Sequence, residues 1–393
     1  MVVAPEFAAQ ASWLEIDAQA MRHNIGVFRE VLGPGVRLGA VLKGNAYGHG
    51  FAQVLPTAHE WCNSIYLIDP RDALKVRAYE RERNAPPRQV LVIGAVDPDE
   101  AVALAQGGID LVLTDAGQER LVAALRTAGA KKLRCHIHLD TGLGREGFTA
   151  RDFPAGVAWI AAARDVIEVV GVLSHFANTE DVTEQNYATQ QLEAFERGVD
   201  RVRDALELDG ALEQHIAASA AALLLPKARL DVVRAGIALY GLWPSNETRL
   251  SAHAVLGKVP ELRPVLTWRC KSQLIKWLPS GSYVGYGCTY RCPAETRIAV
   301  LPVGYSDGYP RLLSGKAHVL VSGQRCPVLG RVMMNHVVID VTRAAKGDEP
   351  VTATLLGRDG GEQLTADQLA SWAESINYEI VTRLGAHLRR TLA

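Results

Sequence analysis

The run VRLGAVL (36–42), followed directly by KGNAYGHG (43–50), is the clearest indication of the type of fold. Its first part is a short, mostly apolar run with the length of a strand buried on both faces, as in parallel sheets. Its second part is a polar, glycine-rich loop that begins with Lys43 at the carboxyl end of that strand. In a barrel of parallel strands this end forms the active-site face. The segment therefore places an amine where such a barrel binds its ligands.

Seven further runs of strand character alternate with amphipathic stretches over the first 250 residues. One of those stretches follows Asp17, a plausible N-cap, and puts Met21, Ile25, Phe28 and Leu32 on one face. The further strands are expected at SIYLI (64–68), QVLVIG (89–94), DLVLT (110–114), KLRCHIHL (132–139), IEVVGVLS (167–174), QHIAAS (214–219) and LDVVRA (230–235). Eight strands with intervening helices predict a (β/α)8 barrel. An open doubly wound sheet is the alternative, but it usually stops at five to seven strands, and no GxGxxG follows the first strand here.

Beyond Pro244 the hydrophobic pattern changes. The stretch TWRCKSQLIKW alternates so that Leu266, Trp268, Cys270 and Leu274 share one face, and further strand-like runs follow it. Thr365 and Gln368 have the spacing of a capping box, which predicts a helix there. A mostly antiparallel β domain is expected, with residues 12–245 forming the barrel and residues 1–11 and 246–393 the second domain.

Composition limits the partners. The formal net charge is −1, with 48% hydrophobic and 22% charged residues, so the chain has no net field for nucleic acid or a membrane surface. No apolar run approaches the length of a membrane span, and the first ten residues do not resemble a signal peptide. The six cysteines form no CxxC pair, which predicts free thiols in the cytoplasm and no metal site. A small-molecule partner is expected.

Several polar residues fall where barrel strands should end, and they would meet at one mouth. These residues are Asp140, Arg145, His175, Ser219, Arg234 and Gly236. Desolvation at such a mouth lowers the pKa of a lysine and frees its amine as a nucleophile for an aldehyde. Ser219 and the turn after Arg234 could bind a phosphate through a hydroxyl and backbone amides. Spacing alone leaves Lys43 equally compatible with a solvated surface lysine.

The segment AVLKGNAYGHG (40–50) resembles the pyridoxal-phosphate lysine segment of alanine racemases. Other segments are similar to that family in the same order along essentially the whole chain. They are LDTGLGREG (139–147), SHFA (174–177), VRAGIALYG (233–241), VGYGCTY (284–290), LPVGYSDGYPR (301–311), GRVMMN (330–335) and YEIVTRLG (378–385). The resemblance implies a (β/α)8 barrel followed by a β domain, in agreement with the strand pattern.

The resemblance also implies two acid/base groups on opposite faces of the substrate. Lys43 would bind pyridoxal 5'-phosphate covalently and act as one of them, and Tyr286 would be the other. Racemisation needs such a pair because the α-proton leaves from one face and returns to the other. Since family members take this tyrosine from a partner subunit, a head-to-tail homodimer is implied.

The remaining site residues follow from the same resemblance. Arg234 would face the pyridine nitrogen of the cofactor, and because a guanidinium only donates, that nitrogen would stay unprotonated. His175 would lie beside the ring and support the tyrosine, while Arg145 and the backbone of Met334 would face the substrate carboxylate. The phosphate would be held by Tyr47, Ser219, Gly236, Ile237 and Tyr378, and the corridor to the site would be lined by Tyr305 and Arg311.

Two positions depart from the family pattern. Many alanine racemases carry a carbamylated lysine where this chain has His138, so we expect His138 to orient Arg145 through a water or an anion such as chloride. A carboxylate or a direct side-chain clamp on Arg145 would contradict that expectation. Asn335 stands where aspartate is usual, and the lost charge could relax the choice of substrate side chain.

The sequence thus predicts a cytoplasmic racemase that interconverts L- and D-alanine for cell-wall precursors. A broad-specificity or serine racemase of the same fold is the first alternative, since such enzymes also resemble this chain around Asn335. A non-catalytic protein that binds pyridoxal phosphate on a single barrel is the second, and it should lack the β domain with Tyr286. A barrel-type amino-acid decarboxylase is the third.

Overall fold

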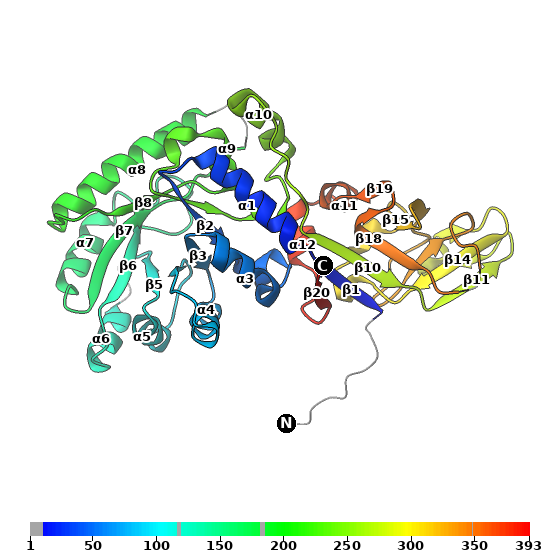
Figure 1. Cartoon of the computed structure of the whole chain (residues 1–393), viewed down its shortest axis with the longest axis horizontal. Helices are drawn as coiled ribbons and strands as arrows, with labels where there is room; N and C mark the ends of the chain where they lie inside the picture. The colour runs from blue at the N-terminus through cyan, green and yellow to red at the C-terminus, as the bar shows by residue number, and fades with distance from the viewer. Residues whose placement is uncertain (1–10, 116–118, 181–184, 348) are drawn as a thin grey trace. The chain divides into compact units, whose positions relative to one another are not determined.

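The computed structural model describes residues 11–115, 119–180, 185–347 and 349–393 (Figure 1). These residues form two compact units. The barrel unit holds Arg22–Lys43 and Leu55–Leu262. The sheet unit holds Gly44–Val54, Arg263–Ala393 and the described part of Met1–Met21.

Eight parallel strands form the barrel, as predicted. Their order around the sheet is β8-β7-β6-β5-β4-β3-β2-β9. The amides of Asp231 and Arg234 donate to the carbonyls of Gln214 and Ala217, which nearly closes the ring between β9 and β8. The strands are β2 (Arg37–Val41), β3 (Ser64–Leu67), β4 (Gln89–Val92), β5 (Asp110–Leu113), β6 (Leu133–His138), β7 (Ile167–Leu173), β8 (Glu213–His215) and β9 (Val232–Ala235).

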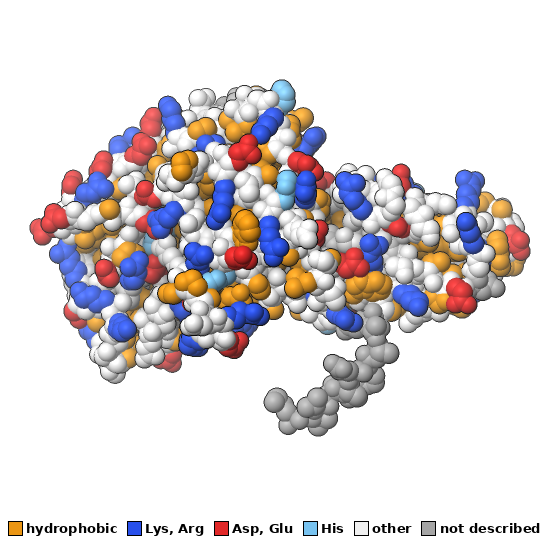
Figure 2. Space-filling view, viewed as in Figure 1, with side chains coloured by type: hydrophobic (Ala, Val, Ile, Leu, Met, Phe, Trp, Pro, Cys, Tyr) orange, Lys and Arg blue, Asp and Glu red, His pale blue; other side chains and the backbone are white. Residues whose placement is uncertain are grey.

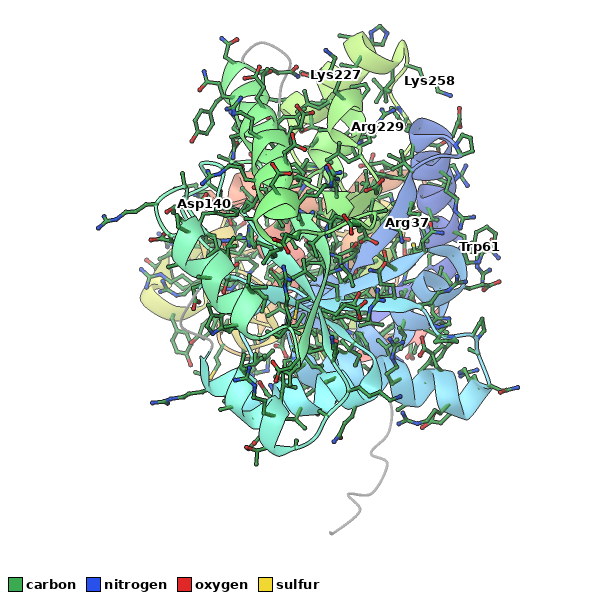
Figure 3. All side chains as sticks on the ribbon, turned by 90° about the vertical axis from the view of Figure 1, so that its left-hand side faces the viewer. Arg37, Trp61, Asp140, Lys227, Arg229 and Lys258 are labelled. Carbon is green, nitrogen blue, oxygen red and sulfur yellow. The ribbon has the colours of Figure 1, made fainter. Side chains whose placement is uncertain are left out.

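Helices surround these strands (Figure 1). The predicted cap of the first helix is present, because Asp17 Oδ1 accepts the amides of Gln19 and Ala20 at 2.8 and 2.9 Å. Trp61, the last residue of α3, lies on the outer side of the strands (Figure 3). The helices are α1 (Ala18–Leu32), α3 (Phe51–Trp61), α4 (Pro70–Arg83), α5 (Pro98–Gly107), α6 (Glu119–Thr127), α7 (Phe153–Ala162), α8 (Asn186–Ala205), α9 (Ser219–Leu224) and α10 (Asn246–Leu256), with 3-10 helices η1 (Pro226–Ala228) and η2 (Ile237–Tyr240).

The sheet unit is mostly antiparallel, as expected. Its large sheet contains β1 (Ser12–Ile16), β10 (Leu266–Lys271), β15 (His318–Val321), β16 (Gln324–Pro327), β18 (Thr352–Asp359), β19 (Glu362–Leu364) and β20 (Arg389–Leu392). A three-stranded sheet contains β11 (Leu274–Leu278), β14 (Thr296–Leu301) and β17 (Val337–Asp340), and a hairpin contains β12 (Tyr283–Val284) and β13 (Tyr290–Arg291). The short helices are η3 (Tyr286–Cys288), η4 (Tyr305–Asp307), η5 (Arg311–Leu313), α11 (Ala366–Trp372) and α12 (Asn377–Thr382).

Three expectations about local structure need correction. The run TWRCKSQLIKW is two strands, since β10 ends at Lys271 and β11 begins at Leu274 in another sheet, where Leu274 is exposed. Strand β8 ends at His215, earlier than expected, because Ser219 already begins α9. Strand β1 was assigned to the barrel, but it pairs with β10 and β20 in the sheet unit.

Because β1 lies in the sheet unit, the boundary at residue 12 is corrected, whereas the boundary at residue 245 stays a prediction; Gly44–Val54 is also grouped in the sheet unit. Among the described residues, no helix combines the length and the apolar character needed to cross a membrane.

On the face shown in Figure 2, basic and acidic side chains are interspersed, as the near-zero net charge suggests.

Candidate active site

The lysine loop has an unusual backbone. In α2 (Lys43–Tyr47), Gly44, Asn45 and Ala46 have φ of 61, 53 and 54° and ψ of 46, 48 and 53°, and Tyr47 has φ of 51°. This is a left-handed turn, which costs roughly 1–2 kcal/mol for each residue with a side chain. Such strain persists only where the surroundings hold it, and it is typical of functional loops.

Contacts within the sheet unit hold this loop. Asn45 Oδ1 accepts the amide of Phe51 at 2.8 Å. The guanidinium of Arg390 donates to the carbonyl of Gly48 at 2.9 and 3.0 Å. The ring of Tyr47 lies 6.3 Å from that of Tyr378, centroid to centroid. The role of Arg390 could not be predicted, because nothing in the local sequence pattern links it to Gly48, 342 residues away.

Gly48 should be sensitive to substitution. Its φ is +79°, and a Cβ would lie 1.8 Å from the carbonyl oxygen of Val381. We expect Gly48→Ala to lower the free energy of unfolding by about 2–4 kcal/mol, measured by urea denaturation. Gly44→Ala is the matched control, because Gly44 has φ of +61° but open space around it, and it should cost only about 1 kcal/mol. Equal losses in the two variants would contradict the steric explanation.

Lys43 lies at the carboxyl end of β2 among positive charges. Burial lowers the pKa of its amine, and the nearby charges of Arg145 and Arg234 lower it further. A lowered pKa increases the fraction of neutral amine at neutral pH, which is the nucleophilic form. The barrel unit therefore brings together three of the predicted site residues, Lys43, Arg145 and Arg234.

Arg234 is a buried guanidinium surrounded by acceptors. It donates to the carbonyls of Ser174, His215 and Ile216 at 2.7, 2.8 and 3.1 Å. It also contacts Nδ1 of His215 at 2.9 Å and Nδ1 of His175 at 3.2 Å. Burial lowers the pKa of Arg234 to about 10, which still leaves it charged at neutral pH.

The contact with Arg234 determines the tautomer of His175. A guanidinium has no acceptor, so Nδ1 of His175 accepts and carries no proton. Burial and the neighbouring cations, Arg234 first among them, lower the pKa of His175 to about 3, so the ring is neutral. Its proton therefore sits on Nε2, which can donate a hydrogen bond.

Arg145 lies in the loop after β6 and has a charged partner that was not expected. Its Nε lies 3.6 Å from a carboxylate oxygen of Glu146, and both side chains are exposed. Burial and the charges of Arg234 and Arg145 lower the pKa of His138 to about 4, so this histidine is neutral. The exposed contact of Arg145 with Glu146, at 3.6 Å, is too long for a hydrogen-bonded clamp, so the orientation of Arg145 by His138 through a water or an anion stays a prediction. An exposed pair of this kind contributes little stability.

The residues predicted to hold the phosphate belong to different units. In the barrel unit, Ser219 Oγ accepts the amide of Gly236 at 3.0 Å, and Ile237 follows as the first residue of η2. This puts a hydroxyl and a backbone turn side by side at the carboxyl ends of β8 and β9. Tyr47 and Tyr378 belong to the sheet unit.

The other predicted residues lie around one pocket of the sheet unit. This pocket has a volume of about 580 Å³, and the side chain of Tyr286 beside it is 72% exposed. Val284, two residues before Tyr286, is buried in an apolar cluster with Cys292, Ile298, Leu329 and Val338. The pocket is lined by Tyr286, Tyr305, Arg311, Arg331, Val332, Met333, Met334, Asn335 and His336.

Asn335 is held by a neighbour that the sequence did not indicate. Its Nδ2 donates to Ser306 Oγ at 2.9 Å, and that hydroxyl donates to the carbonyl of Met334 at 2.8 Å. An aspartate at this position could not donate to the serine. The amide therefore fits the hydrogen-bonding pattern of this turn.

One group of described residues could by proximity hold a metal ion. Ligand atoms of His136, Glu213 and His215 lie within 4.8 Å of one another. However, both ring nitrogens of His215 already contact hydrogen-bonding partners, and Glu213 pairs with Arg37. Hydrogen bonding accounts for this group, and the predicted lack of a metal stays a prediction.

A barrel with a low-pKa lysine and a buried arginine at its mouth is typical of enzymes that bind a carbonyl cofactor through an amine. The family model for the alanine racemase N-terminal domain matches residues 16–244, and that for the alanine racemase C-terminal domain matches residues 265–392. The chain belongs to the alanine racemase family.

Relatives of known name agree with this assignment. An alanine racemase of Symbiobacterium thermophilum is 38% identical over 394 residues, covering 96% of each chain. The solved alanine racemase of Streptomyces lavendulae is 32% identical with a TM-score of 0.87, and the match covers 98% of both chains. The solved enzyme of Bartonella henselae, which has covalently bound pyridoxal phosphate, shares the fold at 24% identity with a TM-score of 0.80, covering 98% of this chain and 100% of that one.

Proposed function

We propose that the protein is a pyridoxal-phosphate-dependent racemase that interconverts L- and D-alanine. The observation that carries this proposal is the barrel mouth, where Lys43 has a lowered pKa beside the buried guanidinium of Arg234. Membership of the alanine racemase family supports the same reaction.

The donors at the mouth suit pyridoxal phosphate. The amine of Lys43 can bond to the aldehyde, and Arg234 offers only donors to the pyridine nitrogen. Ser219 offers a hydroxyl and Ile237 a backbone amide to the phosphate, next to the turn at Gly236, and we assign Gly236, Tyr47 and Tyr378 to it as well. When bound, the cofactor supplies a ring that withdraws electrons and acidifies the α-proton of the amino acid.

Two bases are assigned to the proton transfer. Lys43 Nζ removes or returns the α-proton on one face, and the Tyr286 hydroxyl does so on the other. We assign Tyr286 to the partner subunit of a head-to-tail homodimer, and its high exposure beside an open pocket suits a residue that acts in another subunit's site. His175 can donate from Nε2 to the tyrosine oxygen and stabilise its deprotonated form.

The substrate carboxylate is assigned to Arg145 and the backbone of Met334. Arg145 is exposed, and its pairing with Glu146 is weak enough for a substrate carboxylate to replace it. Tyr305 and Arg311 line the approach to the site. Asn335 is uncharged where aspartate is usual. The missing charge near the substrate favours tolerance of substrate side chains somewhat larger than methyl.

A substrate panel tests this function. We expect chiral product analysis to show the highest kcat/KM on alanine, a lower value on serine, and little turnover of lysine or arginine. Inactivity or the lowest value on alanine would contradict the proposal and favour a racemase of broader specificity. Carbon dioxide release from any of these substrates would instead support a decarboxylase.

We place the protein in the cytoplasm, where its six free cysteines stay reduced. There D-alanine would serve as a precursor of the cell wall.

A further inference from the structure

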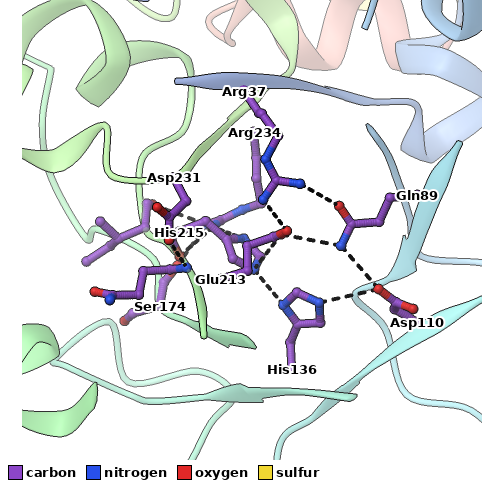
Figure 4. Close-up of polar contacts among 11 residues, drawn as sticks. Arg37, Gln89, Asp110, His136, Ser174, Glu213, His215, Asp231 and Arg234 are labelled. Carbon is purple, nitrogen blue, oxygen red and sulfur yellow. Dashed lines mark hydrogen bonds and ion pairs between the residues drawn. The ribbon is translucent and has the colours of Figure 1, made fainter. Parts of the chain in front are cut away.

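A chain of polar contacts runs through the interior of the barrel, away from the mouth (Figure 4). Arg234 Nη1 contacts His215 Nδ1 at 2.9 Å, and His215 Nε2 contacts His136 Nδ1 at 2.9 Å. His136 Nε2 in turn lies 3.5 Å from a carboxylate oxygen of Asp110. We call Arg234, His215, His136 and Asp110 the barrel relay.

Arg234, the first residue of the barrel relay, determines which atom donates and which accepts in each later contact. Arg234 can only donate, so His215 Nδ1 accepts and the single proton of a neutral His215 sits on Nε2. That proton is donated to His136 Nδ1, which leaves the proton of His136 on Nε2, facing Asp110. Burial, with the charge of Arg234 next, lowers the pKa of His215 well below its usual value, so the ring stays neutral.

The relay ends on a carboxylate that is held in place. Asp110 is the first residue of β5, at the amino end of the strands, and is almost fully buried. Its two oxygens accept from Arg134 Nε at 2.9 Å and from Gln89 Nε2 at 3.1 Å. Burial raises the pKa of Asp110, but the hydrogen bond from Arg134 and the nearby ring of His136 lower it by more, so the carboxyl group has a pKa below its ordinary value and is ionised at neutral pH.

A second carboxylate at the same face lies outside the relay. Glu213 pairs with Arg37. Its Oε1 lies 4.0 Å from His215 Nε2, which is too long for a hydrogen bond. The proton on His215 therefore points to His136 rather than to Glu213.

The backbone leaves room for this arrangement. A Cβ on Gly171, in the neighbouring strand β7, would lie 2.3 Å from His136 Nδ1. The pairing of β6 with β7 also shifts register between Cys135 and His136. Both features place the ring of His136 where it can reach His215.

We propose that His215, His136 and Asp110 are positioning residues for Arg234. They fix the orientation of its guanidinium and partly compensate the positive charge that it presents to the cofactor nitrogen. This inference rests on the proposed function for its catalytic meaning. The recorded partners of the Arg234 guanidinium are carbonyls and imidazoles, so the charge of Asp110 reaches it through two polarised rings. Chains of hydrogen bonds polarise one another in this way in a buried site.

Nitrogen-15 NMR identifies the tautomers of His136 and His215 directly. In the full-length holoenzyme with ¹⁵N-labelled histidine, the signals of the two rings are assigned by their loss in His136→Gln and His215→Gln. We expect both rings to show an unprotonated Nδ1 and a protonated Nε2 across the neutral pH range. A proton on Nδ1 of either ring, or a doubly protonated ring, would overturn the relay.

Three variants test the effect of the barrel relay on Arg234. Asp110→Asn should shift the Nε2 signal of His136 and, more weakly, that of His215, move the absorbance maximum of the lysine-bound cofactor, and lower kcat/KM about tenfold. Glu213→Gln removes a carboxylate from the same face outside the relay and should leave these quantities nearly unchanged. Gly171→Ala changes no polar group, but its Cβ would lie 2.3 Å from His136 Nδ1 and 2.8 Å from the carbonyl oxygen of Glu213, so it should displace the ring of His136 and resemble Asp110→Asn in the histidine signals.

Equal effects of Asp110→Asn and Glu213→Gln would overturn the proposal, since only the loss of charge at that face would then matter. A different result would contradict the proposed function. A protein that shows the expected tautomers but neither binds pyridoxal phosphate nor racemises alanine would contradict the function and not the tautomer chain.

Discussion

Replacing Lys43 by alanine is expected to abolish racemisation together with the absorbance of the lysine-bound cofactor. The amine is both the covalent anchor and one of the two bases, so its loss should lower kcat about 10⁴-fold or more. Chiral analysis of the product and the absorbance spectrum of protein incubated with pyridoxal phosphate measure the two effects.

Lys43→Arg is the control for charge, because it keeps a cation at the mouth but cannot form the covalent bond. It should be as inactive as Lys43→Ala. A visible absorbance band that survives in either variant would show that another lysine carries the cofactor, and would end the assignment of Lys43.

Replacing Tyr286 by phenylalanine should preserve the absorbance and lower racemisation in both directions by about 10²–10⁴-fold. The aromatic ring remains, so only the proton-transfer group is lost. Because Lys43 is intact, one enantiomer should still exchange its α-proton with deuterated solvent while keeping its configuration. Mass spectrometry of each recovered enantiomer detects this one-sided exchange. Near wild-type rates, or equal exchange of both enantiomers, would show that Tyr286 is not the second base.

Mixing the two inactive variants tests the shared site. If Tyr286 acts in the partner's site, a dimer of one Lys43→Ala and one Tyr286→Phe subunit contains one intact site. Random mixing of equal amounts should therefore restore about a quarter of the sites, because half of the dimers are mixed and each has one good site of two. No recovery after verified subunit exchange would place both groups in one subunit.

The strands of the barrel could be predicted because each is a short apolar run between amphipathic helices. The helix after Asp17 and the capping box at Thr365 were equally clear, and both are confirmed. The strand prediction was wrong where the alternation of apolar and polar residues continued across the boundary between two strands. Leu274 keeps the period of Trp268 and Cys270, yet Ser272 and Gln273 separate two strands of different sheets.

The conformation of the lysine loop could not be predicted, because Asn45, Ala46 and Tyr47 do not reveal a left-handed turn. Their geometry depends on contacts with Arg390 and Val381, far along the chain. The barrel relay was missed for a similar reason. His136 and His215 come from strands that are not neighbours, and their meeting depends on barrel curvature rather than on local pattern. The one indication in the sequence is His136 itself, a polar residue in the middle of a run expected to be a barrel strand.

Strand β1 (Ser12–Ile16) has a consequence for how the protein is made. It lies between β10 and β20, and its pairing with β20 is parallel and joins Ile16 to Leu392. The chain up to Leu392 must leave the ribosome before this pairing can form, whereas all eight barrel strands, the last of which ends at Ala235, emerge much earlier. We therefore expect the barrel to assemble first during translation and the large sheet to be completed last, with β1 waiting as an unpaired edge that a chaperone could shield.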